Sequence, residues 1–517
     1  MRRLSCLAVI LSTGALAGCA DNPPTGQPSF DAAAGSGGGG TSAGSAGTSG
    51  GGGTSAASAG TNGGGGSGGG ALAGIGGVAG GGAGKPGIDA GVDARSVGGT
   101  SGAAGGVGGS AGAAGGVAGS GGSAGSVGGS GGAAGVPQLA PPAATGLVAL
   151  NSDFSVTSLS ILSMAGGLLH ADCVDSATGS TGSSSKTISG NTQLPSQPQR
   201  GGAVVIVDAD NGALTFVDPV QCKITRQIAI PGGAKTDPLD LVILSDTKAY
   251  VTRYTKNLAA SDPALAGNDI VVMNPVSGAR IGQIGLDAYA SVVSGATILV
   301  RPDRAIIANG KVVVSLDEID AGYAHYGEGK IVVVDPATDQ VVASVALTGL
   351  YDCQGMDYVA ATKTLLVSCG GAFGSQNQPL ESGIAVVDLG ASPPRLTRSI
   401  SAVAFDDRPV NFSWVLALPP SGGGTRGFAV TNDAINFSAP DALYAFDYVL
   451  GTATKVASGN AYTLGRSAGV PGLLLVPDAS FSTPQIRLFD VTATPRATTG
   501  FTSDPVTGLP PQEVAAY

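Results

Sequence analysis

From residue 146 to the C-terminus, short apolar runs recur along the chain, and each run ends at an Asp, Asn or Ser. Examples are Leu214–Asp218, Ile270–Asn274 and Ile331–Asp335. Their residues are apolar in succession rather than alternately, which indicates strands that are buried on both faces. The Asx side chain at the end of a run bonds to nearby backbone, and a following Pro presets the turn. The pattern therefore predicts short strands joined by tight turns, with no amphipathic helix.

These strand ends repeat at a steady interval. They fall at positions 163, 218, 274, 335, 388, 447 and 490, so that neighbours are separated by 43 to 61 residues. All-β copies with a period of about 50 residues are typical of a β-propeller. We predict an all-β fold in which residues 144–517 form a seven-bladed β-propeller with four-stranded antiparallel blades.

The two ends of this region complement each other. Pro511–Tyr517 has the character of an innermost strand, but no second strand follows it. Gly146–Leu150 has the character of a second strand, but no innermost strand precedes it. Pairing the two would complete the first blade and remove an open sheet edge. We therefore expect the C-terminal strand to close the ring.

Three segments carry a family resemblance. Ala249–Arg253 (AYVTR), Phe428–Asn432 (FAVTN) and Ile331–Asp339 (IVVVDPATD) resemble the YVTN-type, WD40-like propeller repeat. The resemblance covers most of residues 145–517 and implies the propeller fold. The repeats are degenerate, because Ser163 replaces the Asp of the first copy and the last three copies lack the Pro. The family includes many exported proteins without known activity, so the resemblance implies no particular function.

The N-terminus predicts export. Arg2 and Arg3 precede an apolar stretch, Leu4–Leu16, that is too short to span a bilayer as a helix. The run Leu16–Cys19 resembles the lipobox of bacterial lipoproteins, which implies a signal peptide over residues 1–18 and lipidation of Cys19. The alternative is an ordinary signal peptide with an incidental Cys. With Ala20 rather than Asp after the Cys, we expect an outer-membrane lipoprotein of the bacterial cell envelope, facing either the periplasm or the outside.

Residues 19–143 form a separate compositional region. Of the 88 Gly in the chain, 47 lie between residues 35 and 135, among Ala and Ser and almost no large side chains. Such a segment cannot bury enough apolar surface to offset its ordering entropy. We predict a disordered linker, which acts either as a tether or as a filler expanded by repeat slippage.

Charge excludes one class of partner. The chain has a formal net charge of −10, and no Lys/Arg run occurs in the propeller region. An acidic surface repels the phosphate backbone, so we expect no nucleic acid partner and membrane attachment through the lipid alone. We expect a monomer.

Four cysteines remain for the exported region, which favours disulfides. Cys353 and Cys369 are equidistant from a predicted turn at residues 360–362, so they would face each other across a hairpin. Cys173 and Cys222 would pair by elimination. Because they are expected near opposite ends of neighbouring outer strands, they pair only if residues 176–199 bring them together; otherwise they are free thiols.

The long connections all fall on one predicted face of the ring. A rigid ring with one elaborated face is a common way to position a binding surface. The run from Arg301 to Arg304 could anchor an anionic ligand there or form ion pairs between blades. The candidate residues for this face are Asp153, Arg253, Arg301, Asp303, Arg304, Asp317, His325, Tyr326, Asn432, Asp433 and Asp478.

Catalytic motifs are scarce. The chain has two His, no Cys/His spacing typical of zinc and no Gly-x-Ser-x-Gly elbow in the propeller region. We therefore expect no catalytic residue, no metal and no cofactor, and a binding or scaffold module for a protein, glycan or small ligand. The alternative is a propeller enzyme of the lactonase or quinoprotein dehydrogenase kind. The enzyme hypothesis predicts convergent carboxylates or amides near the axis, and the scaffold hypothesis predicts a plugged or featureless channel and exposed apolar residues.

Overall fold

The computed structural model describes residues 139–177, 186–421, 423–432 and 439–517. The predicted signal peptide, Cys19 and most of the predicted linker lie outside these residues. So does Asp433. In the described part no helix is long and apolar enough to cross a membrane.

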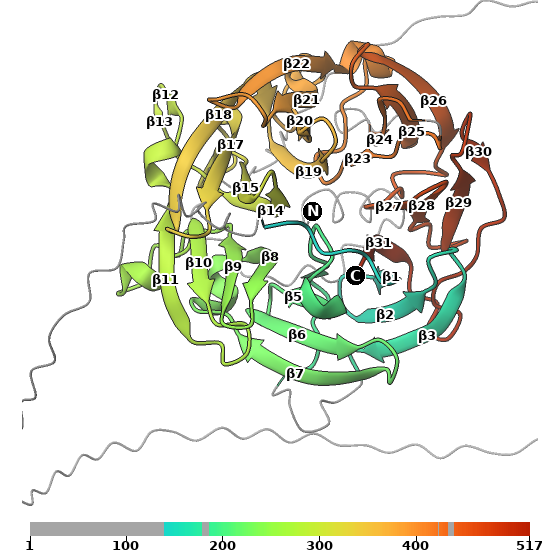
Figure 1. Ribbon diagram of the computed structural model, residues 1–517, viewed down its shortest axis with the longest axis horizontal. Helices are drawn as coiled ribbons and strands as arrows, with labels where there is room; N and C mark the ends of the chain where they lie inside the picture. The colour runs from blue at the N-terminus through green and yellow to red at the C-terminus, as the bar shows by residue number, and fades with distance from the viewer. Residues whose placement is uncertain (1–138, 178–185, 422, 433–438) are drawn as a thin grey trace, which may run out of the picture. The chain divides into compact units, whose positions relative to one another are not determined.

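Seven four-stranded antiparallel sheets make up most of the described part (Figure 1). We number them along the chain and give each from its inner to its outer strand. Sheet 1 contains β31 (Pro511–Ala516), β1 (Leu147–Ser152), β2 (Thr157–Leu162) and β3 (Leu168–Asp175). Sheet 2 contains β4 (Thr192–Gln193), β5 (Val204–Asp208), β6 (Ala213–Asp218) and β7 (Lys223–Ala229). Sheet 3 contains β8 (Pro238–Ser245), β9 (Lys248–Arg253), β10 (Asp269–Met273) and β11 (Arg280–Gly285).

The same order continues in the second half of the region. Sheet 4 contains β14 (Pro302–Ala308), β15 (Lys311–Leu316), β17 (Glu328–Asp335) and β18 (Gln340–Tyr351). Sheet 5 contains β19 (Cys353–Val359), β20 (Thr364–Gly370), β21 (Ser382–Asp388) and β22 (Arg395–Ser401). Sheet 6 contains β23 (Leu416–Ala417), β24 (Arg426–Thr431), β25 (Ala442–Asp447) and β26 (Thr452–Ser458). Sheet 7 contains β27 (Ala468–Val470), β28 (Leu473–Asp478), β29 (Gln485–Asp490) and β30 (Arg496–Ala497).

The sheets are set around a common centre, with strands such as β8, β14 and β19 inside and β3, β7 and β11 outside (Figure 1). Four-stranded antiparallel sheets in this arrangement are the architecture of a β-propeller, so the propeller prediction is confirmed. The connections contain elements that the sequence pattern did not predict. These are a small sheet of β12 (Val292–Val293), β13 (Ala296–Leu299) and β16 (Ile319–Asp320), the helix α2 (Gln378–Glu381), and the 3₁₀ helices η1 (Arg200–Gly202), η2 (Gly233–Thr236), η3 (Pro263–Leu265), η4 (Asp287–Tyr289) and η5 (Ala402–Phe405).

The two ends of the region pair as predicted. β31 runs antiparallel to β1, with Leu147 opposite Ala516 and Ala149 opposite Val514. The Tyr517 amide donates a hydrogen bond of 3.0 Å to the Gly146 carbonyl. The innermost strand of sheet 1 is therefore the last strand of the chain.

The apolar runs are buried on both faces, which explains why they do not alternate. On β15, Val313 packs in a cluster with residues of sheet 5, whereas Val312 and Val314 pack in a cluster with residues of sheet 3. Each sheet is thus sandwiched between its two neighbours, and successive side chains of one strand fill two different interfaces.

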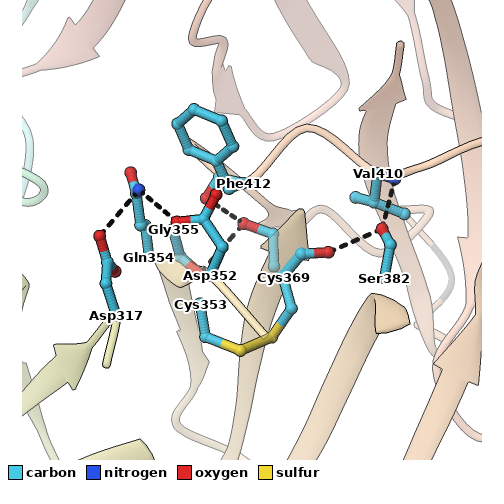
Figure 2. The surroundings of a disulfide bond; sticks show 10 residues. Asp317, Asp352, Cys353, Gln354, Gly355, Cys369, Ser382, Val410 and Phe412 are labelled. Carbon is cyan, nitrogen blue, oxygen red and sulfur yellow. Dashed lines mark hydrogen bonds between the residues drawn. A yellow bond between two sulfur atoms is a disulfide. The ribbon is translucent and has the colours of Figure 1, made fainter. Parts of the chain in front are cut away.

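Both predicted disulfides are present. Cys353 lies opposite Cys369 across β19 and β20, and the two sulfurs are bonded within sheet 5 (Figure 2). Cys173 and Cys222 are also bonded, with their Cα atoms 4.7 Å apart. The bond forms although Cys173 lies toward the end of β3 and Cys222 directly before the start of β7. Between residues 170 and 174, β3 carries extra residues relative to β2, and this bulge includes Asp172 with φ of 49°. The bulge changes the course of the strand beside Cys173.

Candidate functional site

The connections between second and third strands, and those between successive sheets, emerge at the same end of the sheets because neighbouring strands are antiparallel. We call this the loop face. It includes residues 254–268, 317–327 and 371–381. Most candidate residues that the sequence pointed to lie here, and the structure shows what each one contacts.

Arg253 is a structural residue of sheet 3. Its guanidinium group is fully buried and binds the Asp269 carboxylate through two hydrogen bonds, of 2.7 and 2.6 Å. It also donates to the carbonyls of Pro231 and Ala264. Burial raises the pKa of Asp269, and the hydrogen bonds from Arg253 oppose that shift. The guanidinium is occupied on all sides by its own sheet and the adjoining connections.

Arg301 is likewise used by the fold. It donates to the carbonyls of Ile319 and Asp320, at 2.9 and 2.8 Å, and to the Tyr323 hydroxyl at 3.0 Å. Its guanidinium carbon lies 5.0 Å from the ring centre of Tyr254 and 4.1 Å from that of Tyr323. Arg301 therefore holds the connection after β15 in place and does not form an ion pair with Asp303.

Arg304 is buried near the inner edge of sheet 4. Its Nε lies 3.0 Å from Asp303 Oδ1, so this ion pair joins adjacent residues of β14, whereas the expected pair was between blades. Burial works to lower the pKa of Arg304, but the carboxylates of Asp303, Glu513 and Asp240 outweigh it and the net shift is upward. Among the described residues, Arg304 Nη1 has no hydrogen-bond partner.

A bridged pair of carboxyl groups lies beside the Cys353–Cys369 disulfide (Figure 2). The Gln354 side-chain amide donates to Asp317 Oδ2 and to Asp352 Oδ1, each at 3.0 Å. Burial raises the pKa of Asp352 to about 7 and that of Asp317 well above its usual range. Burial also raises the pKa of Asp303 to about 6, against the opposing charge of Arg304. Asp303 lies on β14, Asp317 directly follows β15, and Asp352 lies between β18 and β19.

The remaining candidates do not form one site. Asp153 caps its own turn by accepting from the amides of Ser155 and Val156. His325 is half-exposed, and its Nδ1 lies 2.8 Å from Asp320 Oδ2, while Tyr326 forms a β-bridge with Ile319.

Two other candidates lie near a cavity on the loop face. Asp478 is buried and accepts a hydrogen bond of 2.5 Å from the Thr463 hydroxyl. Asn432 is buried and lines the cavity. The structure therefore places Asn432 on the cavity and Asp478 beside it through Thr463, and it groups Asp303, Arg304 and Asp317 separately.

The loop-face cavity has a volume of about 150 Å³. Its lining comes from sheets 1, 2, 6 and 7 and their connections, including Phe154, Gln193, Phe412, Asp441 and Glu513. These segments are far apart in the sequence, so the cavity exists only where the sheets meet. It combines apolar side chains with a few buried polar groups, which is typical of small-molecule sites.

A second cavity, of about 260 Å³, lies among the inner strands β19, β27 and β31. Arg466 and Ser413 line both cavities, so these residues separate them. Arg466 is held by the carbonyls of Leu194 and Pro195, at 2.6 and 2.9 Å, and lies 3.4 Å from Glu513 Oε2. We call this second cavity the axial cavity. Pro141 lines it as well.

Three buried oxygens on the lining of the loop-face cavity have no hydrogen-bond partner within the described part of the chain. They are Gln193 Oε1, Asp441 Oδ1 and Glu513 Oε1, and the residues that carry them are 2 to 6% exposed. Burial raises the pKa of Asp441 to about 8, and the Leu464 amide, which donates to its Oδ2 at 3.0 Å, opposes the shift. Buried polar groups without partners are uncommon and often mark a ligand or water site.

The sequence reasoning missed Gln193, Asp441 and Glu513. Gln193 and Glu513 lie on the inner strands β4 and β31, and Asp441 directly precedes β25. One signal was available, because polar residues interrupt inner strands that are otherwise apolar, as at Asp240, Gln354 and Glu513.

The described residues contain no group of three or more His, Cys, Asp or Glu side chains that could hold a metal ion. The carboxyl groups of sheets 4 and 5 are thus convergent, as the enzyme hypothesis expects, but they are not arranged as a metal-ligand set.

No protein-family model matches the chain, and neither does any curated protein. Solved structures resemble it weakly. Hydrazine synthase of Kuenenia stuttgartiensis is 15% identical with a TM-score of 0.42, and the match covers 61% of this chain and 80% of that one. The β-propeller domain of Myceliophteria thermophila Cps50 (Swd1) is 11% identical with a TM-score of 0.41, covering 65% and 94%. Citrobacter koseri AztD is 12% identical with a TM-score of 0.37, covering 72% and 97%. Similarity at this level concerns the fold alone.

Proposed function

We propose that this protein is an exported lipoprotein whose propeller is a binding module, with its ligand site in the loop-face cavity. The observation that carries the proposal is the set of buried oxygens without partners on the cavity lining. A carboxyl or amide oxygen removed from water without a hydrogen bond destabilises the fold. A ligand that supplies the missing donors would offset this penalty.

In the proposal the propeller is seven-bladed, of the YVTN type and closed by its last strand. Seven four-stranded sheets and the pairing of β1 with β31 support it. The lipid on Cys19 and the linker over residues 19–143 would attach the module to the envelope. Metabolic labelling with a radioactive fatty acid tests the attachment: the chain should be labelled, and the Cys19→Ser chain should not. Equal labelling of the two would overturn the attachment.

A screen of small polar compounds by ligand-observed NMR tests the binding site. Ala479 lines the cavity, and Ala479→Leu would fill part of it without changing any of the three oxygens. Compounds that bind the unmodified full chain should lose binding to this variant. Binding that is indifferent to Ala479→Leu would place the site elsewhere, and a thermal melt of the variant checks that it folds.

The second candidate is a propeller enzyme of the lactonase or quinoprotein dehydrogenase kind. It is favoured by the buried carboxyl groups of Asp303, Asp317 and Asp352, because perturbed pKa values cluster at catalytic sites. Metal analysis and an absorption spectrum of the purified chain distinguish the two candidates. Stoichiometric calcium, iron or a bound quinone would favour the enzyme over the binding module.

A further inference from the structure

The lining of the loop-face cavity carries hydrogen-bond acceptors that lack donors. Asp441 Oδ1, Glu513 Oε1 and Gln193 Oε1 are buried on its lining, and no described residue donates to them. Asp441 belongs to the segment before β25 in sheet 6, whereas Gln193 and Glu513 belong to the inner strands of sheets 2 and 1. The carboxylates therefore reach the cavity from different sheets.

Four donor groups on the same lining are already engaged by the protein. Arg466 donates to two carbonyls and, at 3.4 Å, to Glu513 Oε2, which leaves Glu513 Oε1 without a donor. The Gln512 amide donates to the Ser152 carbonyl at 2.8 Å, and the Thr463 hydroxyl donates to Asp478. The Ser413 hydroxyl donates to the Asn411 side chain at 2.6 Å. A ligand that satisfies the three oxygens without partners must bring its own N–H or O–H groups.

Charge and size narrow the class of ligand further. Acidic groups exceed basic ones by ten in the whole chain, which attracts cations. The cavity volume of about 150 Å³ matches a cavity that holds one benzene molecule, which has about six heavy atoms. The apolar side chains of Leu150, Phe154 and Leu464 on the lining suit a hydrocarbon segment better than a bare ion.

We propose that the loop-face cavity binds a small organic diamine, with one ammonium group beside Asp441 and the other beside Glu513 and Gln193. Each ammonium group has three donors and no acceptor, which complements this lining. The proposal rests on the proposed function, because it names the ligand class of the same site.

Binding would displace a proton from Asp441. Burial of Asp441 raises its pKa to about 8; the charged groups that act on it are Arg408, which lowers this pKa, and Asp478, which raises it. Arg487 lies 3.8 Å from Asp478 Oδ2. A cation beside the carboxylate favours its ionised form, so at pH 7 about 0.9 proton should leave for the buffer with each diamine bound. Affinity should rise roughly 50-fold between pH 6 and pH 8.

Titration calorimetry on the purified full chain tests the proposal. The probes are α,ω-diamines of three to six carbons, the monoamine of the same length as each, and the corresponding diols. One diamine should bind at least about ten times more tightly than its monoamine, because two anchors act on one ligand. The diols should bind much more weakly. Measurements in buffers of different ionisation enthalpy give the number of protons released.

Asp441→Asn tests the anchor, since it keeps the shape of the side chain and removes its charge. This variant should lose at least about tenfold in affinity at pH 8 and should release no proton. Asp246→Asn is the matched control, because Asp246 is 88% exposed and lies in the turn between β8 and β9, at the other end of the sheets. It should bind like the unmodified chain. Proton release by the unmodified chain does not depend on either variant folding.

Three results would overturn the diamine. They are monoamines that bind as tightly as diamines, diols that bind as tightly as diamines, and an Asp441→Asn variant with unchanged affinity. Diols or other neutral compounds whose binding is lost in Ala479→Leu would overturn the diamine and leave the binding module standing. If no compound of any class binds the cavity, both proposals fall.

Discussion

Two buried acidic regions of this propeller differ in how their charges are satisfied. In sheet 3, the Asp269 carboxylate takes two hydrogen bonds from Arg253, and the carbonyls of neighbouring connections take the other donors of that guanidinium. At the loop-face cavity, Asp441 and Glu513 come from different sheets, and each has an oxygen that no described residue binds. The contrast teaches that a buried charge whose hydrogen bonds are satisfied within one sheet stabilises the fold. Charges that converge from several sheets and keep an oxygen without a donor are available to a ligand.

The largest loss of stability should come from removing part of β31, which completes sheet 1 beside the loop-face cavity. Deleting residues 514–517 removes half of β31, including the buried Val514 and the pairing with β1. Because the cavity needs sheets 1 and 7 side by side, the loss should spread through the whole propeller and exceed roughly 5 kcal/mol. Thermal melts and urea titrations measure it. Melts equal to those of the full chain would mean that the strand is only a tail.

The next largest loss of stability should come from breaking the Arg253–Asp269 ion pair of sheet 3. Arg253→Met leaves the Asp269 carboxylate buried without its partner and should destabilise the protein by about 3–5 kcal/mol. The double variant Arg253→Met with Asp269→Leu removes both charges and should recover most of that loss. Urea unfolding measures both. A double variant as unstable as the single one would show that the ion pair itself, rather than the unpaired carboxylate, governs stability at this position.

The pH dependence of the protein's stability tests the cavity half of this comparison, through the carboxyl group of Asp441. The folded-state pKa of Asp441, about 8, lies above the ordinary Asp pKa of 3.8, so the folded protein binds this proton more tightly than the unfolded chain does. The contribution is fully present below pH 3.8 and is lost as pH rises toward 8, at up to about 1.4 kcal/mol per pH unit.

Asp441→Asn should remove that contribution to the slope. Its stability relative to the unmodified chain should therefore increase between pH 5 and pH 7, as followed by urea unfolding at each pH. Asp303 and Asp352, whose pKa values are raised to about 6 and about 7, keep a slope of the same sign in both proteins. Parallel curves for the two proteins would contradict the assignment to Asp441.

Much of the fold could be predicted because the relevant signals are local. Apolar runs that end at an Asx residue mark the third strands, and the turn at 360–362 set Cys353 opposite Cys369. The Cys173–Cys222 bond was predicted by elimination only, since its geometry depends on a bulge in β3 that no repeat pattern contains.

The candidate site was less accessible to sequence reasoning. The loop face could be predicted from strand order, but polar loop residues were poor guides to the cavity. Asp153 completes its own turn, and Arg253 completes its own sheet. Gln193, Asp441 and Glu513 are separated by up to 320 positions and meet only because the sheets are arranged around one centre. Which of them lacks a partner is a property of three-dimensional packing, and composition does not encode it.

The smallest expected effect on stability concerns the two disulfides, because one lies within a sheet and the other joins two sheets. Cys353–Cys369 spans 16 residues inside sheet 5, and Cys173–Cys222 spans 49 residues between the outer strand of sheet 1 and the start of β7 in sheet 2. A cross-link restricts the unfolded chain more when its loop is longer, and the chain-entropy model gives a difference of about 1 kcal/mol between these loops. In each of two variants, one disulfide is removed by replacing both of its Cys with Ala. Urea unfolding of each variant is then measured with the remaining disulfide intact and again after its reduction. Reduction should destabilise the protein more when the remaining bond is Cys173–Cys222. A larger loss of stability on reducing Cys353–Cys369 would mean that a cross-link within a sheet matters more than one that joins two sheets. The difference between the two regions would then hold for buried charges but not for cross-links.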